Sequence, residues 1–205
     1  MVTPAQFVAR WQAEVVANDS LPDDAQLVVA PRERLAAFQL SEAARNFLTE
    51  AGLPKSCAPC LTFDDLAQGL RRIWEVYSPR PEWTPEQKEG LEPYGMIGSD
   101  GNGSPICVDE RDGRVVIVDH ELLFDRRYKD RRVMFMNSSV AQLAESLLIV
   151  HTLPKQARLD ALRQIDAPAI ADGAFWSYEL MNTPPYDEAK PNNQNAQRKP
   201  WWKFW

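Results

Sequence analysis

The sequence predicts an α+β fold in which an antiparallel sheet, flanked by helices, leads directly into one of them. Three short apolar runs, at residues 105–108, 115–118 and 133–136, have the length of strands. Asp112-Gly113, between the first two, is a pair that closes tight hairpins, because glycine accepts a positive φ without steric cost. The third run ends at Asn137-Ser-Ser139, a typical helix cap. The apolar residues that follow have the spacing of one helix face: Val140, Leu143, Ala144, Leu147 and Leu148.

The N-terminal part of the chain carries the start and stop signals of two helices. Thr3-Pro4 predicts the start of the first, because threonine caps and proline fits the first helical position. Residues 26–30 are a candidate short strand, and a brief helical turn is expected over residues 31–37. Ser41 predicts the cap of the second helix, which Gly52-Leu-Pro54 is expected to end.

The segments on either side of the predicted sheet are assigned from their periodicity. Residues 55–63 are expected to be a loop, and residues 64–77 a helix with a continuous apolar face. Residues 78–93, rich in proline and glutamate, predict a surface loop with at most one helical turn. Two further helices are expected after the sheet, at about residues 154–165 and 169–181.

Length and composition predict a single domain with a tail. Residues 1–181 are expected to form one α+β domain, residues 182–200 a flexible linker rich in Pro and Asn, and residues 201–205 an aromatic tail motif. The net charge of −6 argues against binding to a phosphate backbone. The sequence shows no secretory signal, no apolar window long enough to span a membrane, and an odd number of cysteines. We therefore expect a cytoplasmic protein.

Several segments, in this order and spacing, resemble a known family. They are Phe38-Gln-Leu40, Phe47-Leu48, Gly52-Leu-Pro54, Gly98 to Asp109 (GSDGNGSPICVD), Gly113 to His120 (GRVVIVDH) and Asn137-Ser-Ser139. The set is similar to the SUKH superfamily of SMI/KNR-type proteins, and more narrowly to its immunity proteins of bacterial toxin systems. The resemblance covers about residues 35–150, and residues 154–181 and the tail lie outside the compact pattern.

The resemblance implies a strongly bent antiparallel sheet flanked by helices, with extra C-terminal helices in this chain. It also implies a non-enzymatic protein that binds another protein, often a nuclease or other toxin, and blocks it. Acidic residues around the sheet could meet the basic active site of such a toxin, or could be a solvated acidic surface. The candidate partner-binding residues of the domain are Glu82, Glu86, Asp100, Asn102, Asp109, Glu110 and Asp112.

Two motifs suggest metal or redox chemistry. Asp100 to Ser104 begins like a calcium loop, but Pro105 and Arg111 occupy the positions that need Gly and Glu, so a tight turn is favoured. Cys57-Ala-Pro-Cys60 has the spacing of a redox pair or half a zinc site. Loop packing is the favoured interpretation, and neither a metal nor a cofactor is expected. A redox enzyme using this pair remains a third-ranked alternative.

Three other features have both a structural and a functional interpretation. His120 is favoured as a hydrogen-bonded residue at a sheet edge over a general base. The charge run at residues 125–132 is favoured as a solvated hairpin tip over a nucleic-acid site. The tail could bind a partner protein, lie at an anionic membrane surface or fold back, which makes a tail-directed scaffold the second functional hypothesis. Its candidate contacts are Trp201, Trp202, Phe204 and Trp205.

Overall fold

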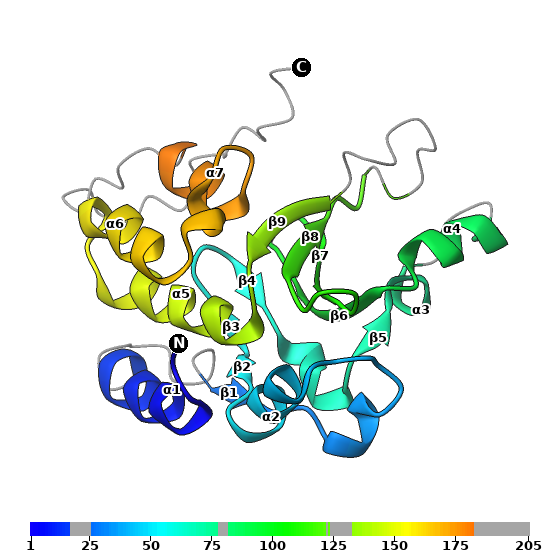
Figure 1. Cartoon of the computed structure of the whole chain (residues 1–205), viewed down its shortest axis with the longest axis horizontal. Helices are drawn as coiled ribbons and strands as arrows, with labels where there is room; N and C mark the ends of the chain where they lie inside the picture. The colour runs from blue at the N-terminus through cyan, green and yellow to red at the C-terminus, as the bar shows by residue number, and fades with distance from the viewer. Residues whose placement is uncertain (17–25, 78–81, 122, 124–132, 183–205) are drawn as a thin grey trace, which may run out of the picture.

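A computed structural model describes residues 1–16, 26–77, 82–121, 123 and 133–182, and it shows an α+β fold (Figure 1). Its main sheet is antiparallel, with strand order β3-β4-β6-β7-β8-β9, and β5 pairs separately with β6. Two further strands, β1 and β2, form a separate antiparallel pair. The strands are β1 Leu27–Val28, β2 Leu53–Pro54, β3 Ser56–Cys57, β4 Leu61–Thr62, β5 Arg71–Arg72, β6 Tyr94–Ser99, β7 Pro105–Asp109, β8 Val115–Val118 and β9 Val133–Asn137.

The predicted strand meander and the helix after it are confirmed. Strands β7, β8 and β9 follow the three apolar runs, and helix α5 (Val140–Thr152) begins where the cap predicts. The hydroxyl of Ser139 accepts a hydrogen bond from the amide of Gln142 at 3.2 Å. The β7–β8 turn is longer than a two-residue hairpin, because Val108 pairs with Val115 and the Asp109 amide donates to the Arg114 carbonyl at 2.8 Å.

The helix signals of the N-terminal part are also confirmed. Helix α1 (Pro4–Arg10) has a full capping box from Thr3 and Gln6, and the π-helix η1 (Trp11–Val16) continues it. Ser41 caps helix α2 (Glu42–Glu50), after the short 3-10 helix η2 (Arg32–Leu35). Gly52 ends α2 with φ +68°, and a Cβ at this position would lie 2.0 Å from the Val28 carbonyl oxygen, so only glycine fits between α2 and β1.

Residues 55–77 differ from the prediction. The expected loop at 55–63 contains the β3–β4 hairpin, and the expected helix over 64–77 is divided in three. A 3-10 helix, η3 (Asp64–Gln68), is followed by β5 and by the single turn α3 (Ile73–Val76). Gly69 separates them with φ +83°, a conformation that ends a right-handed helix.

Two other segments have element boundaries that differ from the predicted ones. The expected surface loop at 78–93 contains helix α4 (Pro85–Leu91), two turns long and capped by Thr84. The expected C-terminal helices are α6 (Lys155–Ile165), a 3-10 turn η5 (Ala167–Ile170) and α7 (Phe175–Asn182). Helix α7 therefore begins six residues later than predicted and includes Asn182, the first residue of the expected linker.

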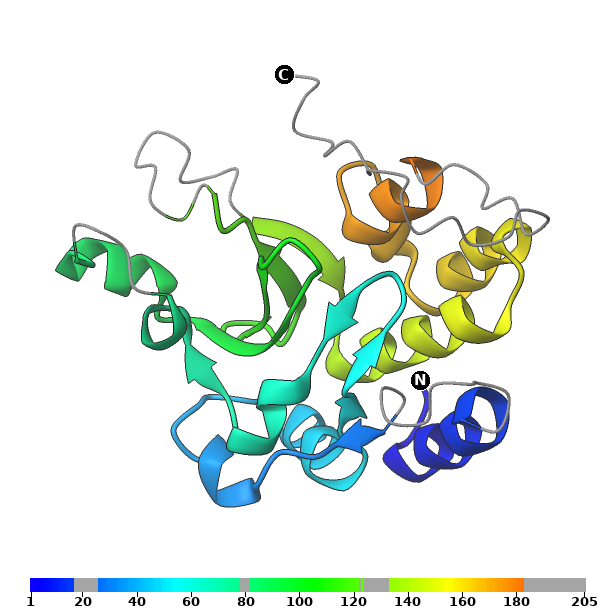
Figure 2. The ribbon, with the colours of Figure 1, turned by 180° about the vertical axis from the view of Figure 1, so that it is seen from behind.

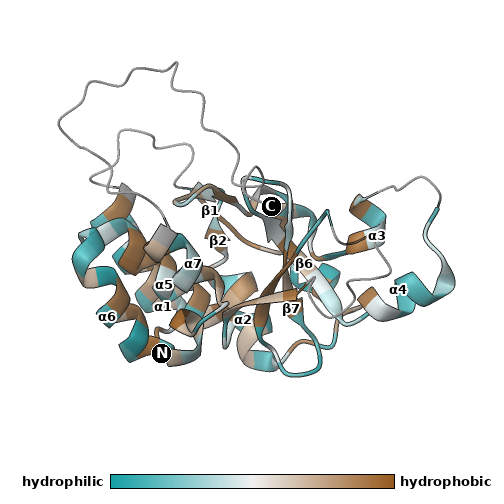
Figure 3. Ribbon diagram, turned by 90° about the horizontal axis from the view of Figure 1, so that it is seen from above, coloured by the Kyte–Doolittle hydropathy of each residue, from teal (hydrophilic) through white to brown (hydrophobic). Residues whose placement is uncertain are grey.

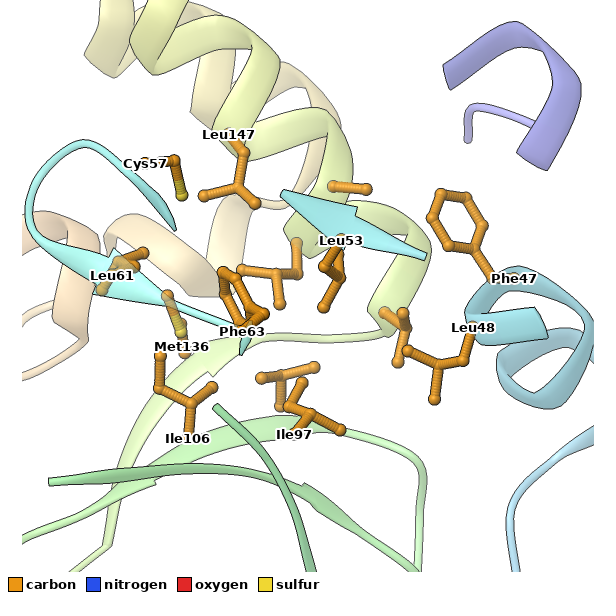
Figure 4. Packing of buried hydrophobic residues seen from close by; sticks show 14 of the residues in the cluster. Phe47, Leu48, Leu53, Cys57, Leu61, Phe63, Ile97, Ile106, Met136 and Leu147 are labelled. Carbon is orange, nitrogen blue, oxygen red and sulfur yellow. The ribbon is translucent and has the colours of Figure 1, made fainter. Parts of the chain in front are cut away.

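Both faces of the main sheet are covered. Helices α5, α6 and α7 lie on one side, and α3 and α4 lie on the other (Figure 1, Figure 2). On the larger side, Phe63, Ile97, Ile106, Met136 and Leu147 point toward one another in the main core (Figure 4). A smaller core on the other side contains Ile73, Leu91, Tyr94, Met96, Cys107, Val116, Val118 and Leu123. Hydrophilic residues lie along the outer surfaces of α4 and α6 (Figure 3).

A buried polar network attaches the C-terminal helices to the end of β9. The Asn137 side-chain amide donates to Ser146 Oγ at 2.9 Å and to Asp166 Oδ2 at 3.0 Å, and Trp176 Nε1 donates to Asn137 Oδ1 at 2.9 Å. Asp166 also accepts from the Ser138 amide at 2.8 Å and from the Ser138 hydroxyl at 2.6 Å. Residues 154–182 are thus built into the domain rather than appended to it.

Candidate functional site

The predicted acidic residues are divided between the two ends of the sheet. Because β6 and β7 are antiparallel, their connecting turn at residues 100–104 lies at one end and the β7–β8 turn at residues 110–113 lies at the other. Five residue steps along β6, at about 3.4 Å each, separate the two ends by roughly 17 Å. Asp100 and Asn102 therefore do not form one cluster with Asp112.

At the 110–113 end, Asp109 is held inside the protein. Its carboxylate is 1% exposed and accepts from Arg111 Nε at 2.8 Å and from Arg111 Nη2 at 2.6 Å. The same guanidinium donates to the Tyr94 hydroxyl at 2.8 Å. Burial alone would raise the pKa of Asp109, but the hydrogen bonds from Arg111 hold that pKa below its ordinary value. Asp109 therefore stabilises the turn.

Glu110 is also engaged within the protein. Its side chain, 8% exposed, pairs with Arg72, which is 13% exposed, and it accepts from the backbone amide of Gln39. The Arg72 guanidinium lies 4.3 Å from the centre of the Phe38 ring, a cation–π contact. Asp112, by contrast, is exposed and pairs with exposed Arg114 at 2.6 Å. Of these three acids, only Asp112 presents its carboxylate to solvent.

At the other end, Asp100 organises the turn at residues 100–104. Its Oδ1 accepts from the Asn102 amide at 2.9 Å and from the Ser104 amide at 2.7 Å, while Asn102 is exposed. These are the bonds of an Asx turn, as expected from the mismatch with the calcium-loop rule. No group of three or more His, Cys, Asp or Glu side chains within the described residues is placed to hold a metal ion.

Two other segments are bonded to this turn. Ser104 Oγ lies 3.1 Å from His120 Nδ1, which brings the end of β8 beside the turn and gives His120 a hydrogen-bonded position near the sheet edge. The Tyr77 hydroxyl donates to the Gly103 carbonyl, and Trp83 Nε1 donates to the Tyr77 carbonyl at 2.7 Å. Burial, and then the nearby Cys107 and Asp100, raise the pKa of Tyr77 to about 12.

Glu179 on α7 lies near the same turn. Burial, and then the like charge of Asp100, raise the pKa of Glu179 above its ordinary value. Segments far apart in the sequence thus bring carboxylates to one end of the sheet. We call this set the acidic rim: Asp100 and Glu179, together with Glu82, Asp119 and Glu121, which are chain neighbours of Trp83 and His120 in the segments just described.

Sequence reasoning identified only part of the acidic rim. Glu82 and Asp100 were expected at a partner-binding face, and Glu86 lies exposed on α4. Asp119 and Glu121 flank His120, a residue that the sequence singles out, but nothing in the pattern pairs them with Asp100. Glu179 was expected only within a packing helix.

The two cysteines of the Cys57-Ala-Pro-Cys60 motif have opposite environments. Cys57 is buried and Cys60 is exposed, and both thiols are free. Burial raises the pKa of the Cys57 thiol far above its ordinary value, which suppresses the thiolate that redox exchange requires. His151 Nε2 accepts from the Ala58 amide at 3.1 Å and so ties this hairpin to α5. The geometry favours a packing role for the motif.

This arrangement predicts selective thiol reactivity. In the native protein, Ellman's reagent is expected to titrate Cys60 rapidly, while Cys57 and Cys107, which are both buried, react only after unfolding in guanidinium. A Cys60→Ser variant should then show no fast phase. A fast phase that survives this substitution would contradict the burial of Cys57.

Some predicted features lie outside the described residues. These are the charge run at residues 125–132, the linker beyond Asn182 and the aromatic tail at residues 201–205. Within the described residues, no helix has the length and apolar character needed to cross a membrane.

Comparison with protein families finds a match over most of the chain. The sequence model of a family described as "SUKH-4 immunity protein" matches residues 3–182. No curated protein and no solved structure matches the chain. The match includes α6, η5 and α7, which the resemblance seen in the sequence had placed outside the family pattern.

Proposed function

Because the chain belongs to the SUKH-4 immunity protein family, we propose that it neutralises a toxin by binding and masking it, with no chemistry of its own. The expected toxin is a protein with a basic active site, such as a nuclease. The expected location is the cytoplasm.

The acidic rim is the observation that carries this proposal. Asp100 and Glu179 come from different elements, and their repulsion contributes to the raised pKa of Glu179. A cationic side chain of a partner placed near both carboxylates would relieve this repulsion. A carboxylate whose pKa is raised by burial and by a neighbouring like charge is a candidate for a functional site. A basic toxin surface is the partner that fits this end of the sheet.

Masking would act in two stages. The carboxylates of the acidic rim, in a chain of net charge −6, would first attract a basic toxin and raise the rate of encounter. The domain would then cover the toxin's active site sterically. Asp109 and Glu110 would contribute indirectly by fixing the sheet, and Asp112 could contact only a toxin that spans both ends.

A pull-down with two forms of the protein tests this proposal. The full-length chain and a version ending at Lys190 are used as baits in the native cells, and captured proteins are identified by mass spectrometry. We expect both baits to hold the same basic toxin, and co-expression of either bait to restore growth of cells making that toxin. Capture of a partner or membrane fraction by the full-length bait alone would favour the tail-directed scaffold instead.

A further inference from the structure

A groove of about 820 Å³ lies away from the acidic rim, between residues 31–38 and residues 67–75. The two segments lie side by side in both ribbon views (Figure 1, Figure 2). Buried Phe38 and Leu70 form its apolar floor, and both pack against Gly95, where a Cβ would lie 3.0 and 2.8 Å from their side chains. The groove is therefore set into the fold by a close backbone contact.

The residues that line the groove carry a formal excess of one positive charge in an otherwise acidic chain. Three arginines and two glutamates contribute to it, whereas the chain as a whole has a net charge of −6. Gln68 adds an exposed amide group at the same wall. The charged lining residues are Glu33, Arg34, Arg71, Arg72 and Glu75.

The three arginines of the groove differ in how many partners their guanidinium groups have within the protein. Arg72 is fixed between Glu110, Glu92 and the Phe38 ring. Arg71 pairs with Asp65 at 2.5 Å, with both side chains partly exposed, and such surface pairs contribute little free energy. Within the described residues, the Arg34 guanidinium has neither a hydrogen-bond nor an ion-pair partner.

The stem of Arg34 is nevertheless held in place. A Cβ on Gly69 would lie 2.4 Å from the Arg34 Cβ, so the two backbones approach as closely as a glycine allows. Arg45 donates to the carbonyls of Leu35, at 2.8 Å, and Phe38, at 3.2 Å, which fixes the segment that carries Arg34. An available guanidinium on a rigid wall is suited to recognising a carboxylate.

We propose that this groove binds a carboxylate-bearing segment of the toxin, with Arg34 and Arg71 as the contacts. The toxin's carboxylate would pair with Arg34 and compete with Asp65 for Arg71, while apolar side chains of the same segment would cover Phe38 and Leu70. This inference rests on the proposed function for the identity of the partner. The toxin would then make two contacts with this protein. A basic surface of the toxin would meet the acidic rim, and an acidic segment of the toxin would occupy the groove.

The groove can be tested without the toxin. A hexaglutamate peptide is titrated into the full-length ¹⁵N-labelled protein at low salt, and the side-chain Nε–Hε signals of the arginines are followed by NMR. We expect saturable shifts at Arg34 and Arg71. We expect Arg34→Ala to weaken peptide binding roughly fivefold, as for the loss of one exposed charge pair. The matched control is Arg114→Ala, which removes an exposed arginine paired with an exposed aspartate and should leave the affinity unchanged.

Two results would overturn the assignment. Shifts that are absent, or equal at Arg34 and Arg114, would show only general attraction between the peptide and arginine. Self-association of the protein that Arg34→Ala abolishes would assign the groove to a second copy of this chain. Because the titration contains no toxin, a failed growth-protection assay and a failed titration are independent results.

Discussion

Replacing Asp166 by alanine is expected to lower the free energy of unfolding by about 3 kcal/mol. Asp166 is 2% exposed, and its carboxylate accepts hydrogen bonds from the Ser138 amide, the Ser138 hydroxyl and the Asn137 side chain. Its removal leaves the half-buried amide and hydroxyl of Ser138 without this acceptor, and the buried Asn137 amide keeps only its bond to Ser146. An unpaired polar group at such a site costs more than its hydrogen bond contributes when formed. Urea unfolding followed by circular dichroism measures the change.

Asp160→Ala is the matched control for this prediction. Asp160 lies on α6, six residues before Asp166, and pairs with Arg163 through side chains that are both exposed. Its loss should change stability by less than about 0.5 kcal/mol. Equal stability of the two variants would mean that the buried network does not hold the C-terminal helices in place.

Reversing the charge of Glu110 is the second large expected effect. Glu110→Lys places an ammonium group against Arg72 in a pair whose side chains are 8% and 13% exposed. Breaking a buried ion pair in this way leaves uncompensated charge and costs about 3–5 kcal/mol. Asp112→Lys, two residues away, alters an exposed pair and should cost less than about 1 kcal/mol. Thermal or urea unfolding of the two variants checks this difference.

Because Glu110 is buried, loss of toxin binding by a variant of the 110–113 turn has to be compared with its loss of stability. A Glu110→Lys protein that fails to bind a toxin would have lost stability rather than a contact. The milder Glu110→Gln variant, which keeps the shape and removes the charge, should be destabilised less than Glu110→Lys. Similar stability of Glu110→Lys and Asp112→Lys would contradict the buried position of Glu110.

Local signals in the sequence predicted most of the sheet and its helices. The caps at Thr3, Ser41 and Ser139 and the apolar runs of β7, β8 and β9 act between near neighbours, so pattern reasoning detects them. The apolar face predicted for residues 64–77 is buried at Leu66, Leu70 and Ile73, but the single helix predicted there is wrong. The apolar residues in this segment have the spacing of a helix face, but Gly69, with its positive φ and its close approach to Arg34, interrupts the helix.

The candidate site was less predictable because its contacts join distant segments. Charged residues in turns are normally solvated, so Asp109 and Glu110 were expected at the surface. Their burial depends on Arg111 and on Arg72, which lies 38 residues from Glu110 in the sequence. Glu179 reaches the acidic rim only because the C-terminal helices pack near the turn at Asp100. Sequence spacing contains no signal for either arrangement.

Binding of a basic toxin at the acidic rim is tested by reversing charges of the rim. Isothermal titration calorimetry with the captured toxin tests it most directly, using a Glu82→Lys/Glu121→Lys protein whose unfolding midpoint is first shown to match that of the unaltered chain. We expect roughly tenfold weaker binding for this double variant, with a reduced dependence on salt, and little change for Asp112→Lys at the opposite end of the sheet. Unchanged affinity of the double variant, or an equal loss in Asp112→Lys, would contradict toxin binding at the acidic rim.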